Sequence, residues 1–349
     1  MQLKLVGAPA GTVCREPKPV RVSVAMMVGN EAHFIADAIR SAQWADEIVI
    51  LDTGSTDGTD DIARSMGARV VRESWRTVDL GDGLWAIDNF GSARTRSIEL
   101  AQGDWVVLLD ADERFDAPHL REILETLPDC IMWGGMPLEH EGRPELAQTM
   151  VRLFRRESRP VYKHRLHEVL CERVRHMPYV ALPIEAGRVV HLGGAHETRK
   201  QYRREERNWR IVQRMLDEDR NDIHALSYAA EMLCDMGRDK EAEVLASHAF
   251  RLCTPDTAAR HRVTLALCEF AWRRQDVAAV RTILDEAASR WKPDANSIAG
   301  RAIAAHFAGD PDAADLLRAA APMAPEMTPI MRDQLARMLA LHEVPHAAE

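Results

Sequence analysis

Short apolar runs alternate with helical patterns along the first third of the chain. The apolar, β-branched runs are residues 20–30, 47–52, 68–75 and 105–109. Apolar residues recur at helical spacing between these runs, over 34–42, 59–67 and 92–103. This alternation predicts a parallel α/β sheet with helices on both faces.

The pattern changes twice further along the chain. Residues 130–195 combine short apolar runs with prolines and glycine pairs, which indicates mixed, partly antiparallel strands. From about residue 200 the chain is rich in Ala, Leu, Arg and Glu with helical periodicity. We therefore expect an N-terminal extension at 1–19, an α/β domain at 20–198 and a helical domain at 199–349.

The helical region contains a loose internal repeat. Residues 235–250, 273–288 and 307–322 each begin with a short polar turn and continue as a helix with acidic and small residues. The turns recur at roughly 34 to 38 residues, close to the period of tetratricopeptide-type helix pairs. The repeat predicts a small helical-repeat domain.

Composition narrows the class of protein. The 349 residues are 46% hydrophobic and 28% charged, as in ordinary globular proteins, and the net charge of −9 argues against general binding to nucleic acid. No apolar stretch approaches the roughly 18 residues of a membrane span. The six cysteines are scattered, without the spacing of a zinc or redox site, so we expect free thiols in a cytoplasmic protein.

Acidic residues follow the apolar run at 105–109, where Asp110, Asp112 and Glu113 come directly after it. Ligands of parallel α/β sheets bind beyond the carboxyl ends of the strands. Strand alternation places Asp110 and Asp112 on the same side, where they could share Mg²⁺ or Mn²⁺. The alternative is a solvated loop.

Asp52 ends a second buried run, before the sequence Thr-Gly-Ser-Thr-Asp-Gly-Thr at 53–59. A carboxylate there could accept hydrogen bonds from a nucleobase N–H or a ribose hydroxyl. A turn with local side-chain capping is the alternative. Asn30 and Glu31 follow the first run and are expected at the same edge of the sheet.

Four segments together resemble the N-terminal half of family-2 glycosyltransferases with the GT-A fold. They are the run ending in Asn-Glu at 30–31, D-T-G-S-T-D-G-T at 52–59, Ala-Arg at 93–94 and W-V-V-L-L-D-A-D-E at 105–113. More narrowly, the chain is similar to a bacterial subgroup with a C-terminal tetratricopeptide-like extension. The resemblance implies a Rossmann-like, mainly parallel mixed sheet followed by an all-α repeat domain. Thr95 departs from the subgroup, which often has Asn there.

The resemblance also implies a nucleotide-sugar donor, with a UDP-sugar favoured, and a divalent cation, Mn²⁺ or Mg²⁺. It assigns Asp52 to the nucleobase, Arg94 to the base or the diphosphate, and Asp112 to the metal as principal ligand. Asp110 would meet the ribose or the metal. The other residues that would line the nucleotide pocket are Met26, Asn30, Glu31 and Ala111.

The middle segment would supply the remaining chemistry. R-x-H-E at 165–168 recurs in this subgroup, and an inverting transfer needs a carboxylate to take the acceptor's proton, which makes Glu168 the candidate base. His191, in H-L-G-G, resembles a histidine that closes the metal and diphosphate site, and imidazole suits Mn²⁺. A structural histidine is the alternative for His191, and His167 could instead be the third ligand or orient Glu168.

Basic residues crowd the segment 152–207. They could steer a diphosphate donor or a phosphate-bearing acceptor, whereas a solvated helix face is the favoured interpretation for 199–207. The residues are Arg152, Arg155, Arg156, Arg159, Lys163, Arg165, Arg199, Lys200, Arg203, Arg204 and Arg207.

The sequence therefore predicts a metal-dependent inverting glycosyltransferase that acts on a saccharide, a peptide or protein side chain, or another hydroxyl or thiol. The helical repeats would recognise the acceptor through a concave surface and could also mediate homo-oligomers. A nucleotidyltransferase is disfavoured because it would need a glycine-rich loop after the first strand. A non-catalytic repeat scaffold and a nucleic-acid-modifying sugar transferase stay open as alternatives, the latter requiring a basic patch that binds DNA.

Overall fold

The computed structural model describes residues 3–81, 83–192, 197–257, 259–293, 295–326 and 335–339. The chain divides into two compact units, Met1–Ile211 and Val212–Glu349. The boundary falls within one long helix, α6 (Glu197–Glu218).

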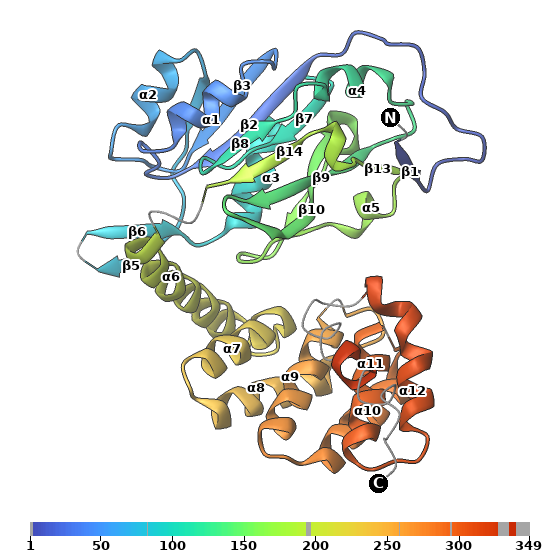
Figure 1. The fold of residues 1–349 in the computed structure, drawn as a ribbon. Coiled ribbons are helices and arrows are strands. Elements are labelled where there is room, and N and C mark those ends of the chain that lie inside the picture. Colours follow the sequence, from blue (N-terminus) through green and yellow to red (C-terminus); the bar gives the residue numbers. More distant parts are fainter. Residues whose placement is uncertain are drawn as a thin grey trace. The chain divides into compact units, whose positions relative to one another are not determined.

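The first unit is built on a ten-stranded mixed sheet (Figure 1). Its parallel half has the order β7-β2-β3-β4, so the chain starts in the middle and works outward in both directions. These strands are β2 (Val22–Val28), β3 (Glu47–Asp52), β4 (Arg69–Arg72) and β7 (Trp105–Leu108). They are the predicted apolar runs, which confirms the parallel α/β sheet.

The other half of the sheet is largely antiparallel, as the pattern of residues 130–195 predicts. Strand β10 pairs antiparallel with β7 on one side and with β9 on the other. Further strands extend this half, and β14 pairs with both β8 and β9. Its strands are β1 (Lys4–Val6), β8 (Glu113–Asp116), β9 (Trp133–His140), β10 (Arg143–Arg155), β13 (Tyr179–Ala181) and β14 (Arg188–His191).

Helices cover both faces of the sheet because its central strands are apolar on both sides. In β2, Val24 packs into the core cluster that includes α1 and α4, whereas Ala25 faces the cluster that includes α3 and α5. Figure 1 shows α3 on the opposite face from α1. The helices are α1 (Ile35–Ser41), α2 (Thr59–Ser65), α3 (Phe90–Leu100), α4 (Leu120–Thr126) and α5 (Glu172–Arg175), with 3-10 turns at Arg156–Ser158 and Ile184–Ala186.

Two small hairpins outside the main sheet flank α3. The first joins β5 (Thr77–Gly81) to β6 (Leu84–Ile87), and the second joins β11 (Tyr162–Lys163) to β12 (Val169–Leu170). Neither hairpin is predicted from the sequence pattern. Both lie next to residues of the candidate site.

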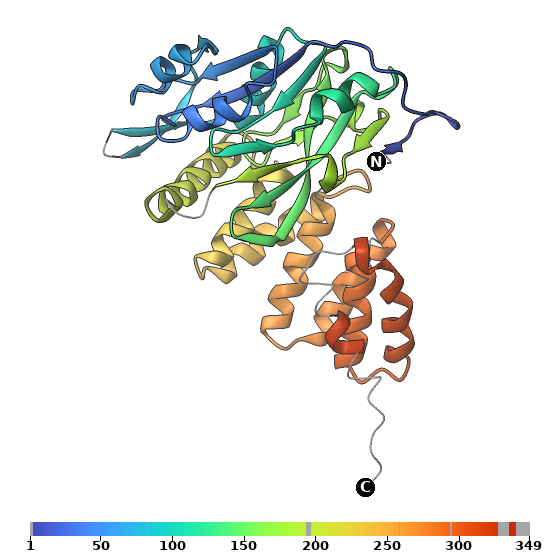
Figure 2. The same ribbon diagram turned by 45° about the horizontal axis from the view of Figure 1, so that its top comes forward.

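The second unit consists of stacked helix pairs, as Figure 2 shows. Helices α7 and α8, α9 and α10, and α11 and α12 form successive neighbouring pairs, which confirms the tetratricopeptide-like repeat. The predicted polar turns lie between the two helices of each pair. The helices are α7 (Ile223–Asp235), α8 (Asp239–Leu252), α9 (Arg260–Arg273), α10 (Val277–Arg290), α11 (Ala295–Phe307) and α12 (Ala313–Ala320), followed by a 3-10 turn at Ala321–Glu326.

All six cysteines are free thiols. None of the described helices combines the length and the apolar character that crossing a membrane requires.

Burial in the central sheet yields a first prediction. Val24 in β2 is 0% exposed, whereas Val13 in the N-terminal segment is 75% exposed. Val24→Ala should lower the free energy of unfolding by about 2 kcal/mol, because it removes buried methyl groups and leaves a cavity. Val13→Ala is the matched control, and urea denaturation should give it a change below about 0.5 kcal/mol. Equal effects of the two substitutions would contradict the central position of β2.

Candidate active site

The predicted site residues gather beyond the carboxyl ends of β2, β3 and β7. Because these strands are parallel neighbours, the loops after them lie at one edge of the sheet. Asn30 follows β2, Asp52 ends β3, and Asp110 follows β7. Helix α3 and the β11–β12 hairpin add Arg94 and Glu168.

An ion-pair chain of alternating sign forms the centre of the site. Arg94 donates from Nε to Glu168 Oε1 at 2.6 Å and from Nη1 to Asp110 Oδ1 at 3.1 Å. Arg152 reaches Asp110 Oδ2 at 3.5 Å through Nη1 and hydrogen-bonds Glu113 through Nη2. Each arginine therefore bridges two carboxylates, and Asp110 is shared by both arginines.

The charges in this ion-pair chain shift the pKa values of the side chains that form it. Burial opposes ionisation of Asp110, but Arg94 and Arg152 outweigh it and hold the pKa of Asp110 well below its usual range. Asp110 and Glu168 likewise outweigh burial at Arg94 and hold its pKa above the ordinary value. Glu113 differs, because its burial raises its pKa to about 7 against the attraction of Arg152.

Asp110 and Asp112 do not lie in a strand, so the alternation argument made from the sequence is wrong. Strand β7 ends at Leu108, and residues 110–113 form a turn. The Glu113 N–H donates to Asp110 O at 3.0 Å, and the Asp110 N–H donates to Glu113 Oε2 at 2.9 Å. This local bonding competes with strand pairing, and it directs the two aspartates to different partners.

Asp112 lies with His191 rather than with Asp110. His191 Nε2 is 3.3 Å from Asp112 Oδ2, and the Leu192 N–H donates to Asp112 O at 2.9 Å. The hydrogen bond with Asp112 raises the pKa of His191. Within the described ranges, no group of three or more His, Cys, Asp or Glu side chains is arranged as a metal site. The structure thus brings together two of the three predicted metal ligands.

The loop after β2 is tied to the loop after β3. Asn30 has a left-handed φ of 57°, and its Oδ1 accepts the Thr56 N–H at 2.8 Å. The Glu31 N–H donates to Thr59 Oγ1 at 2.8 Å. The short polar side chains of residues 55–59 bond their own turn and the neighbouring loop, because Asp57 Oδ1 accepts the Thr59 N–H at 3.1 Å and Ser55 Oγ accepts the Asn30 N–H at 3.0 Å. Local capping, which their alternative interpretation predicts, is therefore one part of their role, and they also fix Asn30 and Glu31 at the sheet edge.

Asp52 is completely buried and only partly satisfied. Its Oδ1 accepts the N–H groups of Gly54 at 2.9 Å and Ser55 at 2.7 Å. Its Oδ2 accepts no hydrogen bond from the described residues, and Arg72 Nε lies 3.9 Å from it. A buried carboxylate oxygen without a donor is costly. It is therefore a candidate acceptor for a ligand N–H or O–H.

Two other predicted residues contribute to the core. Met26 is 1% exposed and Ala111 is 4% exposed, and both belong to the main hydrophobic cluster. Their side chains pack inside the domain, so only their backbone could face a ligand. The Ala111 carbonyl accepts a hydrogen bond from Arg114 at 2.9 Å.

Glu168 lies in the loop between β11 and β12, which is pressed onto α3. A Cβ at Gly91 would lie 2.3 Å from the His164 carbonyl oxygen, so only glycine permits this approach. Thr95 Oγ1 accepts the Tyr162 N–H at 2.8 Å and donates to Gly91 O at 2.9 Å. Thr95, the departure from the resembled subgroup, thus helps to join the loop to the helix.

Arg207, in the described part of α6, extends from the basic segment toward the site. The Arg207 guanidinium lies 4.7 Å from the centre of the Phe90 ring, and burial lowers the pKa of Arg207 to about 10, partly opposed by the charge on Glu168. The side chains of Arg199, Lys200 and Arg203 lie outside the described residues.

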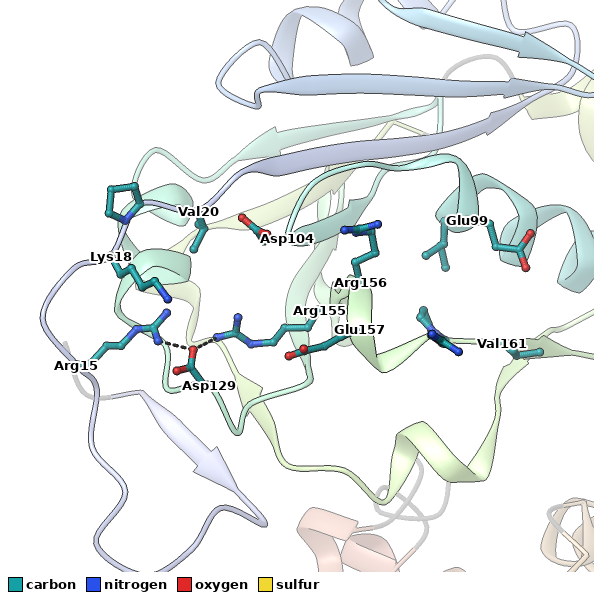
Figure 3. Close-up of a pocket in the computed structure, with 14 residues that line it drawn as sticks. Arg15, Lys18, Val20, Glu99, Asp104, Asp129, Arg155, Arg156, Glu157 and Val161 are labelled. Carbon is teal, nitrogen blue, oxygen red and sulfur yellow. Dashed lines mark hydrogen bonds and ion pairs between the residues drawn. The ribbon is translucent and has the colours of Figure 1, made fainter.

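A separate cavity of about 730 Å³ lies at the opposite end of β7 (Figure 3). Asp104, which precedes β7, lines it, and Arg15 and Arg155 both reach Asp129. Its basic and acidic lining residues are nearly balanced in number, and β7 separates it from Asp110. This cavity is therefore not part of the candidate site.

Sequence reasoning missed the roles of Arg152, Glu113 and Gly91. Arg152 is a single charged residue within the apolar run Met-Val-Arg-Leu-Phe, and such a position signals a buried ion pair. Glu113 and Gly91 carry no comparable signal, because their roles depend on segments distant in sequence.

Comparisons with known proteins agree with this architecture. Residues 23–130 match the sequence profile of Glycosyl transferase family 2. A TPR repeat-containing protein of Synechococcus elongatus is 25% identical over 267 residues, which cover 74% of this chain and 63% of that protein. An uncharacterized glycosyltransferase of Rickettsia bellii is 35% identical over 104 residues, which cover 30% of this chain and 31% of that protein. The chain thus spans only part of the length of both relatives.

Solved structures overlap this chain less completely. A crystal structure of glucosyl-3-phosphoglycerate synthase from Mycobacterium tuberculosis, in complex with Mn²⁺ and UDP-glucose, shares 25% sequence identity with this chain. The match covers 41% of this chain and 59% of that chain, with a TM-score of 0.31.

The family profile covers β2 to the end of α4, which contains the parallel half of the sheet and the Asp110 turn. The Synechococcus relative extends the likeness to 74% of the chain. This chain therefore carries a family-2 glycosyltransferase domain of the GT-A fold, followed by a tetratricopeptide-like helical region.

Proposed function

We propose that the protein is a nucleotide-sugar-dependent glycosyltransferase that transfers the sugar with inversion to an acceptor hydroxyl, thiol or related group. The observation that carries this proposal is the Glu168–Arg94–Asp110 ion-pair chain at the carboxyl ends of the parallel strands. In a family-2 domain, these ion pairs place the candidate base, Glu168, beside the Arg94 guanidinium, a cation suited to binding a diphosphate.

Asp52 supports the donor half of the proposal. Its buried Oδ2 lacks a donor among the described residues, and a nucleobase N–H would supply one. Asn30 and Glu31, fixed by the loop after β3, would border the same nucleotide. We favour a uridine nucleotide, as the family resemblance implies.

Asp112 and His191 are the residues that would hold a divalent cation. Asp112 offers a carboxylate with a 32% exposed side chain, and His191 offers an imidazole 3.3 Å away, a donor pair that suits Mn²⁺ and that the donor's phosphates would complete. Such a cation would act as a Lewis acid on the leaving diphosphate. Because Asp110 pairs with two arginines, we assign it to positioning Arg94 or to binding the ribose, in preference to binding the metal.

Arg94 would change partners during the reaction. Its guanidinium already bridges two carboxylates, and a diphosphate is a third anion of the kind that such a fork binds. When the diphosphate binds the Arg94 guanidinium in place of Glu168, the Glu168 carboxylate becomes free to accept the proton of the attacking acceptor group. The acceptor oxygen or sulfur then forms its bond to the anomeric carbon as the bond to the diphosphate breaks.

The helical unit would recognise the acceptor. Its helices α7 and α9 border a groove of about 360 Å³ lined by charged residues of both signs, including Glu231, Arg262 and Glu269. A stacked-repeat surface of this type suits an extended polar acceptor such as a saccharide or a peptide.

Removal of the Asp112 carboxylate tests the cation site. Asp112→Ala should lower Mn²⁺- or Mg²⁺-dependent release of nucleoside diphosphate from a nucleotide-sugar by more than about 100-fold, because the leaving group loses its charge neutralisation. The measurement is nucleotide release across a panel of nucleotide-sugars. Asp116→Ala is the matched control, since Asp116 lies in β8 and pairs with Arg188. Equal activity of the two variants would contradict the assignment of Asp112.

Removal of the Glu168 charge tests the base. Glu168→Gln should slow transfer to the best acceptor of a saccharide and peptide panel by roughly 10² to 10⁴-fold, while donor affinity stays within about twofold of wild type. Glu172→Gln, an exposed glutamate in α5, is the matched control. Transfer by Glu168→Gln at the wild-type rate would show that another group takes the proton. Nucleotide-sugar binding without turnover by the wild-type protein would favour the repeat-scaffold alternative.

A further inference from the structure

The loop that carries Glu168 has a strained backbone. His164 and His167 adopt left-handed φ angles of 70° and 50°, although neither is glycine. Such conformations cost free energy and persist only where the surrounding structure holds them. The contacts that hold residues 162–168, here called the Glu168 segment, therefore decide where the carboxylate lies.

Helix α3 supplies part of this support through its backbone. The Phe90 N–H donates to Arg165 O at 2.8 Å, and Thr95 accepts the Tyr162 N–H. Gly91 permits the close approach of the segment's carbonyl groups. These contacts fix the main chain of the segment, but they leave the Arg165 side chain to be placed by other groups.

Asp88 provides a contact of a different kind. Its carboxylate side chain is 6% exposed, and its Oδ2 lies 3.2 Å from Arg165 Nη1. The same oxygen lies 3.5 Å from Arg76 Nε, and the Asp88 N–H donates to Arg76 O at 3.0 Å. Asp88 thus joins the Glu168 segment to both ends of the β5–β6 hairpin, since Arg76 precedes β5 and Asp88 follows β6.

The β5–β6 hairpin also reaches the donor side of the site. Trp85 in β6 lies against the backbone of Gly54, because a Cβ there would come within 3.1 Å of the indole ring. Thr53, Gly54, Arg72, Trp75 and Trp85 line a cavity of about 530 Å³ beside the loop that follows Asp52. The hairpin therefore contacts the Asp52 loop through Trp85 and the Glu168 segment through Asp88.

We propose that Asp88 is a positioning residue that fastens the Glu168 segment to the β5–β6 hairpin, and thereby sets the place of Glu168 relative to the donor side of the site. The geometric part of this inference concerns the segment alone, whereas its catalytic part rests on the proposed function. A buried carboxylate paired with Arg165 holds the segment more firmly than a neutral side chain, because charge-assisted hydrogen bonds are the stronger ones.

Hydrogen–deuterium exchange of the full-length protein tests the geometric part without any ligand. In Asp88→Asn, which keeps the shape of the side chain but removes its charge, amides of residues 162–168 should exchange roughly tenfold faster than in wild type. Amides of β2 and β3 should be unchanged. Asp79→Asn is the matched control, because Asp79 is an exposed residue of the same hairpin whose Oδ1 accepts the Gly81 N–H.

A second variant distinguishes loss of this ion pair from a general folding defect. Arg165→Gln removes the same ion pair from the other side and should accelerate exchange in the same residues. Arg165→Lys keeps a positive charge and should restore part of the protection. The double variant Asp88→Asn/Arg165→Gln should be no worse than either single variant, as expected for two partners of one interaction.

Steady-state kinetics with a UDP-sugar and Mn²⁺ test the catalytic part. Asp88→Asn should lower kcat roughly tenfold and leave the Kd for UDP, measured by calorimetry, within about twofold of wild type. Unchanged exchange at 162–168 in both Asp88→Asn and Arg165→Gln would overturn the inference, as would weakened UDP binding with an unchanged kcat. If the wild-type protein turns over no nucleotide-sugar, the proposed function fails, whereas the exchange result still decides whether Asp88 positions the segment.

Discussion

The candidate site depends on the neutralisation of carboxylates that converge from several parts of the chain. Asp110, Glu113 and Glu168 would repel one another beside the apolar end of β7, and Arg94 and Arg152 bridge them in an alternating chain. Partly buried charges of this kind are tolerated only when they are paired. Under the proposed function, a diphosphate would take the place of Glu168 on Arg94 and leave the Glu168 carboxylate free to accept a proton.

The rest of the first unit holds these alternating ion pairs in place. The parallel strands bring Asp110 next to the loops after β2 and β3, and the antiparallel strand β10 beside β7 carries Arg152 to Asp110 and Glu113. Glycine at position 91 lets the Glu168 segment approach α3 closely enough for Arg94 to reach Glu168. Loss of any one of these supports would leave a charge without its partner, so the fold and the site constrain each other.

Much of the fold could be predicted from the sequence because its signals are local. The apolar run at 47–52 is β3, and the polar turns at 235–238 and 273–276 lie between paired helices. The arrangement of the site could not be predicted in the same way. Arg94 and Glu168 are 74 residues apart, and their pairing depends on the close approach at Gly91. The β5–β6 hairpin does carry a sequence signal of its own, since Gly-Asp-Gly at 81–83 separates two short alternating runs. The prediction that Asp110 and Asp112 lie on one side of a strand is wrong because local bonding between Asp110 and Glu113 ends the strand before them.

The proposed function depends above all on binding of a nucleoside diphosphate, and thermal unfolding with added ligand tests this binding most directly. In the presence of Mn²⁺, UDP and at least one nucleotide-sugar should raise the melting temperature of the first unit, whereas uridine without phosphates should raise it much less. At a ligand concentration about 100 times the Kd, the expected stabilisation is about 2.7 kcal/mol. If no nucleoside diphosphate or nucleotide-sugar shifts the unfolding transition, with either Mn²⁺ or Mg²⁺ present, the carboxylate and arginine chain does not form a donor site.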